Sequence, residues 1–254
     1  MISTIVPIHN ITEKFEQNLK LLRDELAVSF KNYEVIVSYN GRSLAREFEF
    51  LRQPQIIYIS SLIIGKGHAL KRGFEKSSGD PVVFIDADME LQPKDIKNFA
   101  ALLDIYQADI VIGSKRHPYS QVNYPWHRKI LSWCYQIFIR LALNIKGVRD
   151  SQVGLKLFRR EVLNSVLPKI LVKQYAFDLE VLAVASRLGY NKILEAPIRL
   201  DYHHNIFQTT NLQDFKKLLK MIWYLFIDTL AIIYRMRILK YYDKRSKSQE
   251  TISK

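Results

Sequence analysis

Three carboxylates stand close together at one point of the chain. Asp86-Ala87-Asp88 follows the apolar run Val82–Ile85 directly, and Glu90 comes two residues later. Two carboxylates separated by one residue can approach one hard cation, and Mg²⁺ or Mn²⁺ prefers oxygen ligands and shares its other positions with phosphates. An Asp-x-Asp triplet alone is most often a solvated turn. This triplet, however, directly follows an apolar run that is typical of a buried strand. We therefore predict that Asp86, Asp88 and Glu90 hold such a cation.

A glycine turn precedes these carboxylates. Gly65-Lys66-Gly67 joins an apolar run to a helical pattern. Backbone N–H groups at a helix start, together with a lysine, can hold an anionic group. An ordinary turn would look the same, but the spacing of this turn before Asp86 favours a shared site.

The elements that must position these residues alternate along the first 113 residues. Strands are predicted at Ile2–Pro7, Tyr33–Ser38, Gln55–Ile59, Pro81–Ile85 and Asp109–Gly113. Helices are predicted at Glu13–Ser29, Ser43–Arg52, His68–Ser77 and Pro93–Tyr106. This alternation predicts a mostly parallel sheet sandwiched by helices, with ligands bound at the carboxyl ends of the strands. The polar pairs His9-Asn10 and Asn40-Gly41 fall at such ends.

The second half is less regular. Its predicted elements are a helix at Trp126–Leu143, a strand at Gly154–Arg159, a helix at Ala176–Leu188, a strand at Lys192–Leu200 and a long helix at Leu212–Leu239. We expect an α/β domain over residues 1–210, an amphipathic helix over 211–242 and a basic, disordered tail over 243–254.

The long C-terminal helix bears on membrane binding. A membrane span needs about 20 uninterrupted apolar residues, and Asp228-Thr229 breaks this run. At about 100° per residue, its charged side chains share one half of the helix, which is typical of a basic helix lying among lipid headgroups. Packing on the core as an ordinary helix is the other interpretation, and both remain open.

Composition narrows the class of protein. The 254 residues are 48% hydrophobic and 25% charged, so a large core is possible and global disorder is not expected. The single cysteine, Cys134, excludes an intramolecular disulfide framework. The N-terminal residues carry no secretory signal pattern, which predicts a cytoplasmic protein.

The net charge of +13 is unevenly distributed. Ten Lys and Arg residues stand between Lys115 and Arg160 against one acid, and seven stand between Arg235 and Lys254 against two. Such clusters suit nucleic acid, an anionic bilayer or a phosphorylated substrate. Charge alone does not separate these partners.

The motifs resemble one known family. Gly65–Leu91 resembles the core signature of family 2 glycosyltransferases, which have the GT-A fold, and Ile5–Asn10 resembles their first strand and donor-binding loop. Val111–Arg116 is similar to a strand end of the polyprenyl-phosphate enzymes. Arg149–Phe158 and Ala176–Glu180 are similar to segments of dolichyl-phosphate glucosyltransferases. The resemblance implies a GT-A-like fold and transfer of a glucosyl or mannosyl group.

Donor and metal residues follow from this resemblance and from the strand ends. Asp86 and Asp88 would hold Mg²⁺ or Mn²⁺ on the diphosphate of a nucleotide-sugar donor, with Glu90 beside them. The expected donor-binding residues are Pro7, His9, Asn10, Asn40, Lys66 and Asp86. The family usually has an acidic pair before Gly-Ser after its second strand, where this chain has Tyr39–Ser43. This departure leaves a choice between a UDP-hexose and a GDP-hexose.

The acceptor residues are expected in the first basic cluster. They are Lys115, Arg116, Arg128, Lys129, Ser132 and Lys156. Arg128, Lys129 and Ser132 match the acceptor-phosphate segment of the polyprenyl-phosphate enzymes. A hydroxyl acceptor needs a general base, whereas a phosphate with a second pKa of about 6 is already anionic at neutral pH. Asp88 and Asp178 are the expected catalytic residues, Asp178 as base only for a hydroxyl.

The sequence thus predicts a metal-dependent, inverting hexosyltransferase acting on a polyprenyl phosphate, peripheral at the inner face of an anionic membrane. Its nearest rival is a family 2 enzyme that acts on a sugar hydroxyl of a cell-envelope glycan. A basic nucleic-acid-binding protein is the rival from another class. No nucleic-acid partner is expected, because carboxylates stand where a phosphate strand would need cations.

Overall fold

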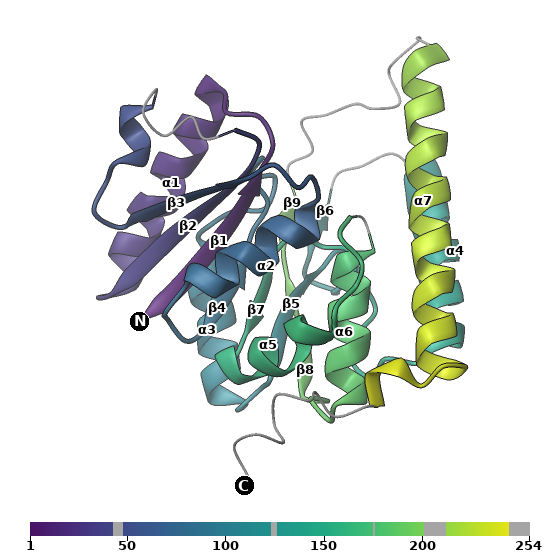
Figure 1. Ribbon diagram of the computed structural model, residues 1–254. Helices are drawn as coiled ribbons and strands as arrows, with labels where there is room; N and C mark the ends of the chain where they lie inside the picture. The colour runs from purple at the N-terminus through teal and green to yellow at the C-terminus, as the bar shows by residue number, and fades with distance from the viewer. Residues whose placement is uncertain (43–47, 123–125, 175, 201–211, 244–254) are drawn as a thin grey trace, which may run out of the picture.

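The computed structural model describes residues 1–42, 48–122, 126–174, 176–200 and 212–243, without the side chains of residues 126–132, 134, 212–219 and 221 (Figure 1). Its strands are β1 Ile2–Ile8, β2 Tyr33–Asn40, β3 Ile56–Ser61, β4 Val82–Phe84, β5 Ile110–Ser114, β6 Gln121–Val122, β7 Lys156–Phe158, β8 Ile193–Pro197 and β9 Arg199–Leu200. The helices are α1 Glu13–Ser29, α2 Lys66–Lys76, α3 Asp95–Ile105, α4 Trp126–Leu143, α5 Arg160–Val166, α6 Phe177–Arg187 and α7 Leu212–Arg237. Short 3₁₀ turns lie at Glu49–Leu51, Leu167–Lys169 and Tyr241–Asp243.

Within the described residues, seven strands form one sheet in the order β3-β2-β1-β4-β7-β5-β8. The pairs β1–β2, β1–β4, β2–β3 and β5–β8 are parallel, and only β7 runs antiparallel to its two neighbours. The mostly parallel sheet expected from the sequence is therefore confirmed. Parallel strands end at the same edge, and their carboxyl ends gather the polar loops there.

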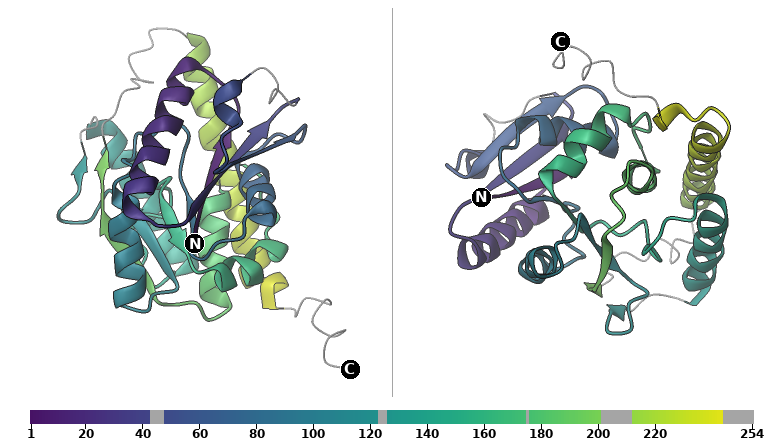
Figure 2. Two further views of the ribbon diagram at one scale, coloured as in Figure 1. Left: turned by 90° about the vertical axis from the view of Figure 1, so that its left-hand side faces the viewer. Right: turned by 90° about the horizontal axis from the view of Figure 1, so that it is seen from below.

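Helices cover both faces of this sheet (Figure 2). Alternate residues of a strand point to opposite faces, so Val83 packs with α1 and α3 while Phe84 packs with α2, α5 and α6. Thr12 caps the N-terminus of helix α1, and its hydroxyl accepts a hydrogen bond from the N–H of Phe15. Two separate apolar cores result, one on each face of the sheet.

Two predicted elements differ in the structure. Of the helix expected at Ser43–Arg52, residues 43–47 lie outside the described residues, and the remainder holds only the turn Glu49–Leu51. The single strand expected at Lys192–Leu200 is two strands. Pro197 has no N–H to continue the ladder, so β8 ends there and β9 pairs with β6 in a second, two-stranded sheet.

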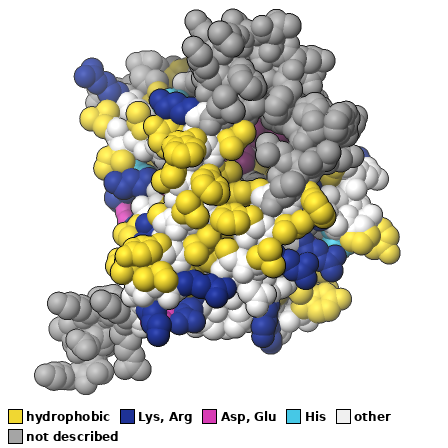
Figure 3. Space-filling view, turned by 90° about the vertical axis from the view of Figure 1, so that its right-hand side faces the viewer, with side chains coloured by type: hydrophobic (Ala, Val, Ile, Leu, Met, Phe, Trp, Pro, Cys, Tyr) yellow, Lys and Arg dark blue, Asp and Glu magenta, His cyan; other side chains and the backbone are white. Residues whose placement is uncertain are grey.

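The C-terminal helix α7 lies beside α4 at one side of the molecule (Figures 1 and 2). Tyr135 of α4 hydrogen-bonds Thr229 at 2.9 Å, and Ile232 is buried in the core. A different side of α7 leaves large apolar residues exposed, and Figure 3 shows an apolar surface on this face of the molecule. The helix thus packs on the core and still exposes apolar surface, and its location among lipid headgroups stays a prediction. Among the described helices, none has enough continuous apolar length to cross a bilayer.

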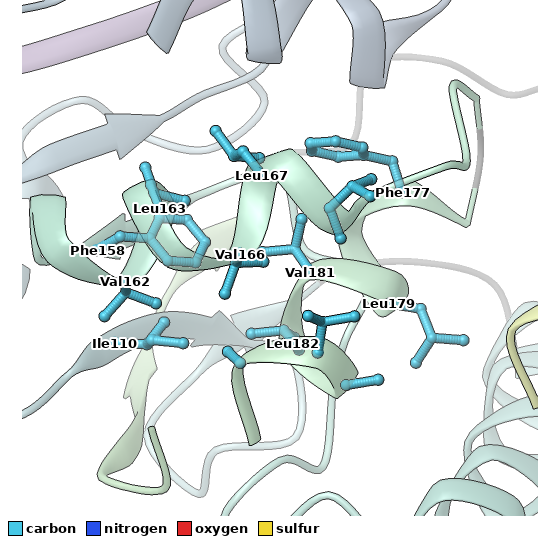
Figure 4. Close-up of a cluster of buried hydrophobic side chains, with 14 of the residues drawn as sticks. Ile110, Phe158, Val162, Leu163, Val166, Leu167, Phe177, Leu179, Val181 and Leu182 are labelled. Carbon is cyan, nitrogen blue, oxygen red and sulfur yellow. The ribbon is translucent and has the colours of Figure 1, made fainter. Parts of the chain in front are cut away.

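Helix α6 connects α7 to the core. Its apolar residues pack with α5 and with Phe158 of β7 (Figure 4). Glu180 of α6 is fully buried and accepts hydrogen bonds from the N–H groups of Leu171 at 3.1 Å and Val172 at 2.7 Å. Arg235 of α7 donates to the same carboxylate at 2.9 Å, and so does the hydroxyl of Tyr242. One buried carboxylate therefore ties the loop before α6 to the C-terminal helix.

Replacing Glu180 by Gln should lower the free energy of unfolding by about 3–5 kcal/mol, because Arg235 would keep its charge without a buried partner. Urea denaturation of the full chain measures this loss. The matched control is Glu75→Gln, since Glu75 forms an exposed pair with Arg72 and its loss should cost less than about 1 kcal/mol. Equal losses in the two variants would contradict the anchoring role of Glu180.

Candidate functional site

A cavity of about 560 Å³ opens at the carboxyl ends of β1, β2 and β4. It is lined by Pro7, Ile8, His9, Asn40, Ile64, Gly65, Lys66, Asp86, Ala87, Asp88, Gln152, Gln174, Asp178 and Leu225. The structure thus brings seven of the expected site residues to one cavity, namely Pro7, His9, Asn40, Lys66, Asp86, Asp88 and Asp178. These residues come from three strand ends and two helices, so the sheet edge assembles the site.

The aspartate turn follows β4 and is held from the side by α1. The Asn18 side chain donates to the carbonyl oxygens of Ala87 and Asp88, each at 3.0 Å. Asp88 is exposed, and its Oδ1 accepts a hydrogen bond at 3.2 Å from the backbone N–H of Glu90. Asn18 therefore holds the backbone of this turn from a helix outside the motif.

The expected third carboxylate ligand is not confirmed. The described residues contain no group of three His, Cys, Asp or Glu side chains that could hold a metal ion. Met89 adopts a left-handed backbone with φ of 50°, so the chain turns between Asp88 and Glu90. Two carboxylates still fit Mg²⁺ or Mn²⁺, which proteins commonly bind through one or two carboxylates plus substrate phosphates.

Alternating charges run from this turn into the interior. Lys66 Nζ lies 2.7 Å from Asp86 Oδ1 and 3.4 Å from Asp178 Oδ2. Lys156 Nζ lies 2.7 Å from Asp178 Oδ1 and also donates to the carbonyl oxygen of Val153. The side chain of Lys66 is 32% exposed and that of Lys156 is 1% exposed. We call Asp86, Lys66, Asp178 and Lys156 the charge ladder.

The charge ladder shifts the protonation equilibria of its members. Burial disfavours the carboxylate of Asp178, but Lys156 and Lys66 outweigh it and hold the pKa of Asp178 below its usual value. Burial also opposes the charge on Lys66, yet Asp178 and Asp86 raise the pKa of Lys66. Burial lowers the pKa of Lys156 despite Asp178. The pairing of Asp178 therefore stabilises the fold above the ordinary carboxyl range and is lost as pH falls through the lowered pKa.

Close backbone packing surrounds the ladder. Gly65 has φ of 146°, a backbone conformation that residues with a side chain rarely adopt. A Cβ at this position would lie 2.3 Å from the carbonyl oxygen of Lys173. That same oxygen accepts a hydrogen bond from the N–H of Gly67 at 2.9 Å. A Cβ on Gly154 would lie 1.9 Å from Asp86 Oδ2. The absence of a side chain at Gly65 lets the glycine turn approach the backbone of Lys173, and its absence at Gly154 leaves room for the carboxylate of Asp86.

Asn40 and His9 line the opposite part of the cavity. His9 Nδ1 lies 3.2 Å from the carbonyl oxygen of Asn40, and Asn40 Nδ2 donates to the carbonyl oxygen of Gly65 at 3.4 Å. The buried Oδ1 of Asn40 has no hydrogen-bond partner among the described residues. Asn40 thus presents an acceptor that an N–H group of a ligand can satisfy.

Several expected residues lie elsewhere. Asn10 is exposed and does not line the cavity. Lys115 faces the buried Asp150, 3.7 Å from its Oδ2, and Arg116 donates its backbone N–H to Ser114 at 3.3 Å. Lys156 lies in the ladder below the cavity, a geometry that does not suit direct contact with an acceptor phosphate. The expected residues whose side chains lie outside the described part are Arg128, Lys129 and Ser132.

Sequence reasoning missed Asn18, Gln152, Gln174 and Leu225. Gln152 stands within the motif Arg149–Phe158 and could have been found there. Asn18 is a single polar residue on an amphipathic helix, and Leu225 belongs to α7, so neither carries a local signal. Only the packing of α1 and α7 brings them to the site.

Comparison with curated proteins finds relatives over most of the chain. A dolichyl-phosphate beta-glucosyltransferase of Dictyostelium discoideum is 29% identical over 206 residues, which cover 74% of this chain and 63% of the relative. An undecaprenyl-phosphate mannosyltransferase of Micrococcus luteus is 29% identical over 206 residues, which cover 77% of this chain and 81% of the relative. The chain spans less than two thirds of the length of the first of these relatives.

Solved structures match the fold. A mannosyl-3-phosphoglycerate synthase from Rubrobacter xylanophilus aligns with a TM-score of 0.69 and 16% identity, over 93% of this chain and 74% of that one. A glucosyl-3-phosphoglycerate synthase from Mycobacterium tuberculosis, in complex with Mn²⁺, UDP-glucose and phosphoglyceric acid, aligns with a TM-score of 0.66 and 20% identity, over 97% of this chain and 81% of that one. The GT-A-like architecture expected from the sequence is thus confirmed.

A comparison of the sequence with models of protein families identifies the family of this chain. The model of the family described as Glycosyl transferase family 2 matches residues 3–167, from β1 through the end of α5. That stretch contains the glycine turn, the aspartate turn and Lys156 of the charge ladder. Because the match spans well over half of its residues, the chain belongs to glycosyl transferase family 2.

Proposed function

We propose that this protein transfers a hexose from a nucleotide-sugar donor to a polyprenyl phosphate, with inversion, with a divalent cation and at the surface of a membrane. The observation that carries the proposal is the cavity that combines Asp86, Asp88 and Lys66 with a third, ion-paired carboxylate, Asp178. The relatives named as dolichyl- and undecaprenyl-phosphate transferases support the acceptor class.

The donor would lie along the cavity with its diphosphate at the aspartate turn. Asp86 and Asp88 would hold Mg²⁺ or Mn²⁺, which when bound offsets the charge that develops on the departing nucleoside diphosphate. Lys66 carries a raised pKa and would bring a permanent cation to the same phosphates. The buried Oδ1 of Asn40 would accept a hydrogen bond from the nucleoside. A solved structure of the same fold contains Mn²⁺ and UDP-glucose, which supports a divalent cation and a nucleotide-sugar as ligands of this class of cavity.

The state of Asp178 supports a phosphate acceptor. A general base works best when its pKa lies near the operating pH, whereas Lys156 and Lys66 lower the pKa of Asp178. A polyprenyl phosphate is anionic without enzyme help, so one of its oxygens can attack the anomeric carbon directly. Such a single displacement breaks the bond to the diphosphate from the opposite side and inverts the anomeric configuration.

The exposed side of α7 supports contact with a membrane. Trp223, Leu230 and Tyr234 are exposed and, at 3.6 residues per turn, form an apolar stripe along this helix. Figure 3 shows an apolar surface on the side of the molecule where α7 lies. Leu225 of the same helix lines the donor cavity. A helix that rests in the interface by this stripe would place the cavity near the headgroups, where the phosphate of a lipid acceptor lies. We accordingly propose a peripheral location at the cytoplasmic face.

Replacing Asp88 by Asn should reduce transfer roughly a hundredfold or more, because the cation site loses one of its two charges. Transfer should be followed with radiolabelled donor at several Mn²⁺ concentrations, and Mn²⁺ binding by calorimetry. Asp104→Asn is the control, since Asp104 is an exposed aspartate on α3. Full activity of the parent protein in EDTA would contradict the metal role.

Replacing Arg128 by Ala should slow transfer to a polyprenyl phosphate roughly ten- to a hundredfold, because a charge-assisted hydrogen bond contributes about 1.5–3 kcal/mol. Nucleotide binding, measured by calorimetry, should stay unchanged. Arg140→Ala, on the same helix and exposed, is the control.

The same assay tests the need for a base. Asp178→Asn alone would leave Lys156 buried without its partner, so the informative variant is Asp178→Asn with Lys156→Met. If the phosphate is its own nucleophile, this pair should keep activity within about tenfold of the parent. A loss of about a hundredfold or more, with a harmless Arg128→Ala, would reject the phosphate acceptor and favour a sugar hydroxyl.

Replacing Trp223 and Leu230 together by Gln should weaken binding to anionic vesicles roughly tenfold or more, because each large apolar side chain contributes about 1.5–3 kcal/mol when buried. Sedimentation with vesicles measures this, and a thermal melt shows that the fold survives. The control is Val28→Gln, a highly exposed apolar residue of α1. Vesicle binding equal to that of the parent would reject the membrane role of the stripe.

A further inference from the structure

A second cavity lies between α7 and the loop before α6. Its volume is about 610 Å³, and the loop contributes Leu171, Val172, Lys173 and Gln174. Helix α7 contributes Lys220, Tyr224, Asp228 and Arg235. Gln174 also lines the donor cavity, so the two cavities meet at this residue.

Positive charge predominates in this second cavity. Arg235 is already bonded to the buried Glu180 at 2.9 Å. With that pair set aside, Lys173 and Lys220 outnumber Asp228 two to one. Lys220 lies over the ring of Tyr224, with its Nζ 5.8 Å from the ring centre. The cavity thus combines two ammonium groups that come from different segments of the chain.

Its position relative to the apolar stripe points to a ligand. At 3.6 residues per turn, Lys220, Asp228 and Arg235 share one side of α7, and Trp223 and Tyr234 lie on the neighbouring side. An interfacial helix of this kind keeps its apolar side among acyl chains and its cationic side at the level of the phosphates. The mouth of the second cavity would then lie at headgroup depth.

We propose that this second cavity binds a phosphate group, and that an anionic lipid headgroup is its source at the membrane. Lys173 and Lys220 would make charge-assisted hydrogen bonds to the phosphate oxygens, and Asp228 would oppose them. The site differs from the donor cavity and from the acceptor residues proposed above, because none of its cations belongs to either set. Its ligand would hold α7 against the loop Leu171–Gln174.

The test uses the full chain with two probes, inorganic phosphate followed by calorimetry and vesicles followed by sedimentation. The vesicles contain phosphatidylcholine, with or without phosphatidylglycerol, and chloride keeps the ionic strength constant. Lys173→Ala with Lys220→Ala should weaken phosphate binding roughly tenfold or more, whereas Asp228→Asn should strengthen it. Lys97→Ala, an exposed lysine of α3, is the control.

The vesicle arm identifies the source of the phosphate. If headgroups occupy the cavity, the double lysine variant should lose affinity for phosphatidylglycerol vesicles while its weaker binding to phosphatidylcholine alone is unchanged. If free phosphate is the ligand, the variants should alter phosphate binding and leave both vesicle types unaffected. Variants that match Lys97→Ala with both probes would overturn the proposal, whatever the outcome of the transfer assays.

Discussion

The ion pair between Lys156 and Asp178 is the interaction on which the site depends. Both side chains are almost completely buried, and such charges are tolerated only when they are paired and hydrogen-bonded. Lys156 sits on the antiparallel strand β7 and Asp178 on the first turn of α6, so this pair fixes that helix against the middle of the sheet. Asp178 can then share its second oxygen with Lys66, and Lys66 in turn reaches Asp86 at the surface. The charge ladder thus connects the aspartate turn at the surface to the buried ammonium group of Lys156.

Helix α6 contributes to two cavities through residues only two positions apart. Asp178 lines the cavity at the strand ends, and Glu180 holds the loop between this cavity and the second one beside α7. The carbonyl oxygen of Lys173 in that loop accepts a hydrogen bond from the N–H of Gly67. The glycine turn is therefore bonded to a loop that Glu180 holds in position. A short stretch of α6 therefore links the glycine turn with the C-terminal helix, although the two are far apart in sequence.

Local pattern was sufficient to predict the parallel sheet, most helices and the approach of Lys66 to Asp86, because parallel strands bring their carboxyl ends to one edge. The family match also agrees with the resemblance read from Gly65–Leu91. Three features depended on packing that no local pattern encodes. The chain turns at Met89 between Asp88 and Glu90, the burial of β7 takes Lys156 away from the basic surface, and α1 supplies Asn18. The charge excess between Lys115 and Arg160 was a correct observation, but net charge does not distinguish a lysine paired inside the fold from one that faces solvent.

Strand β7 has a consequence for the order in which the chain can fold during synthesis. β4 and β5 do not pair with each other, because β7 lies between them and bonds to both. Everything up to Ser114 can leave the ribosome while these two strands still present unpaired edges, which attract other strands and invite aggregation. The sheet becomes continuous only once Phe158 has emerged. Until then nascent chains expose these edges through the whole of α4, and a fragment that stops short of β7 contains the aspartate turn without the strand that joins β4 to β5.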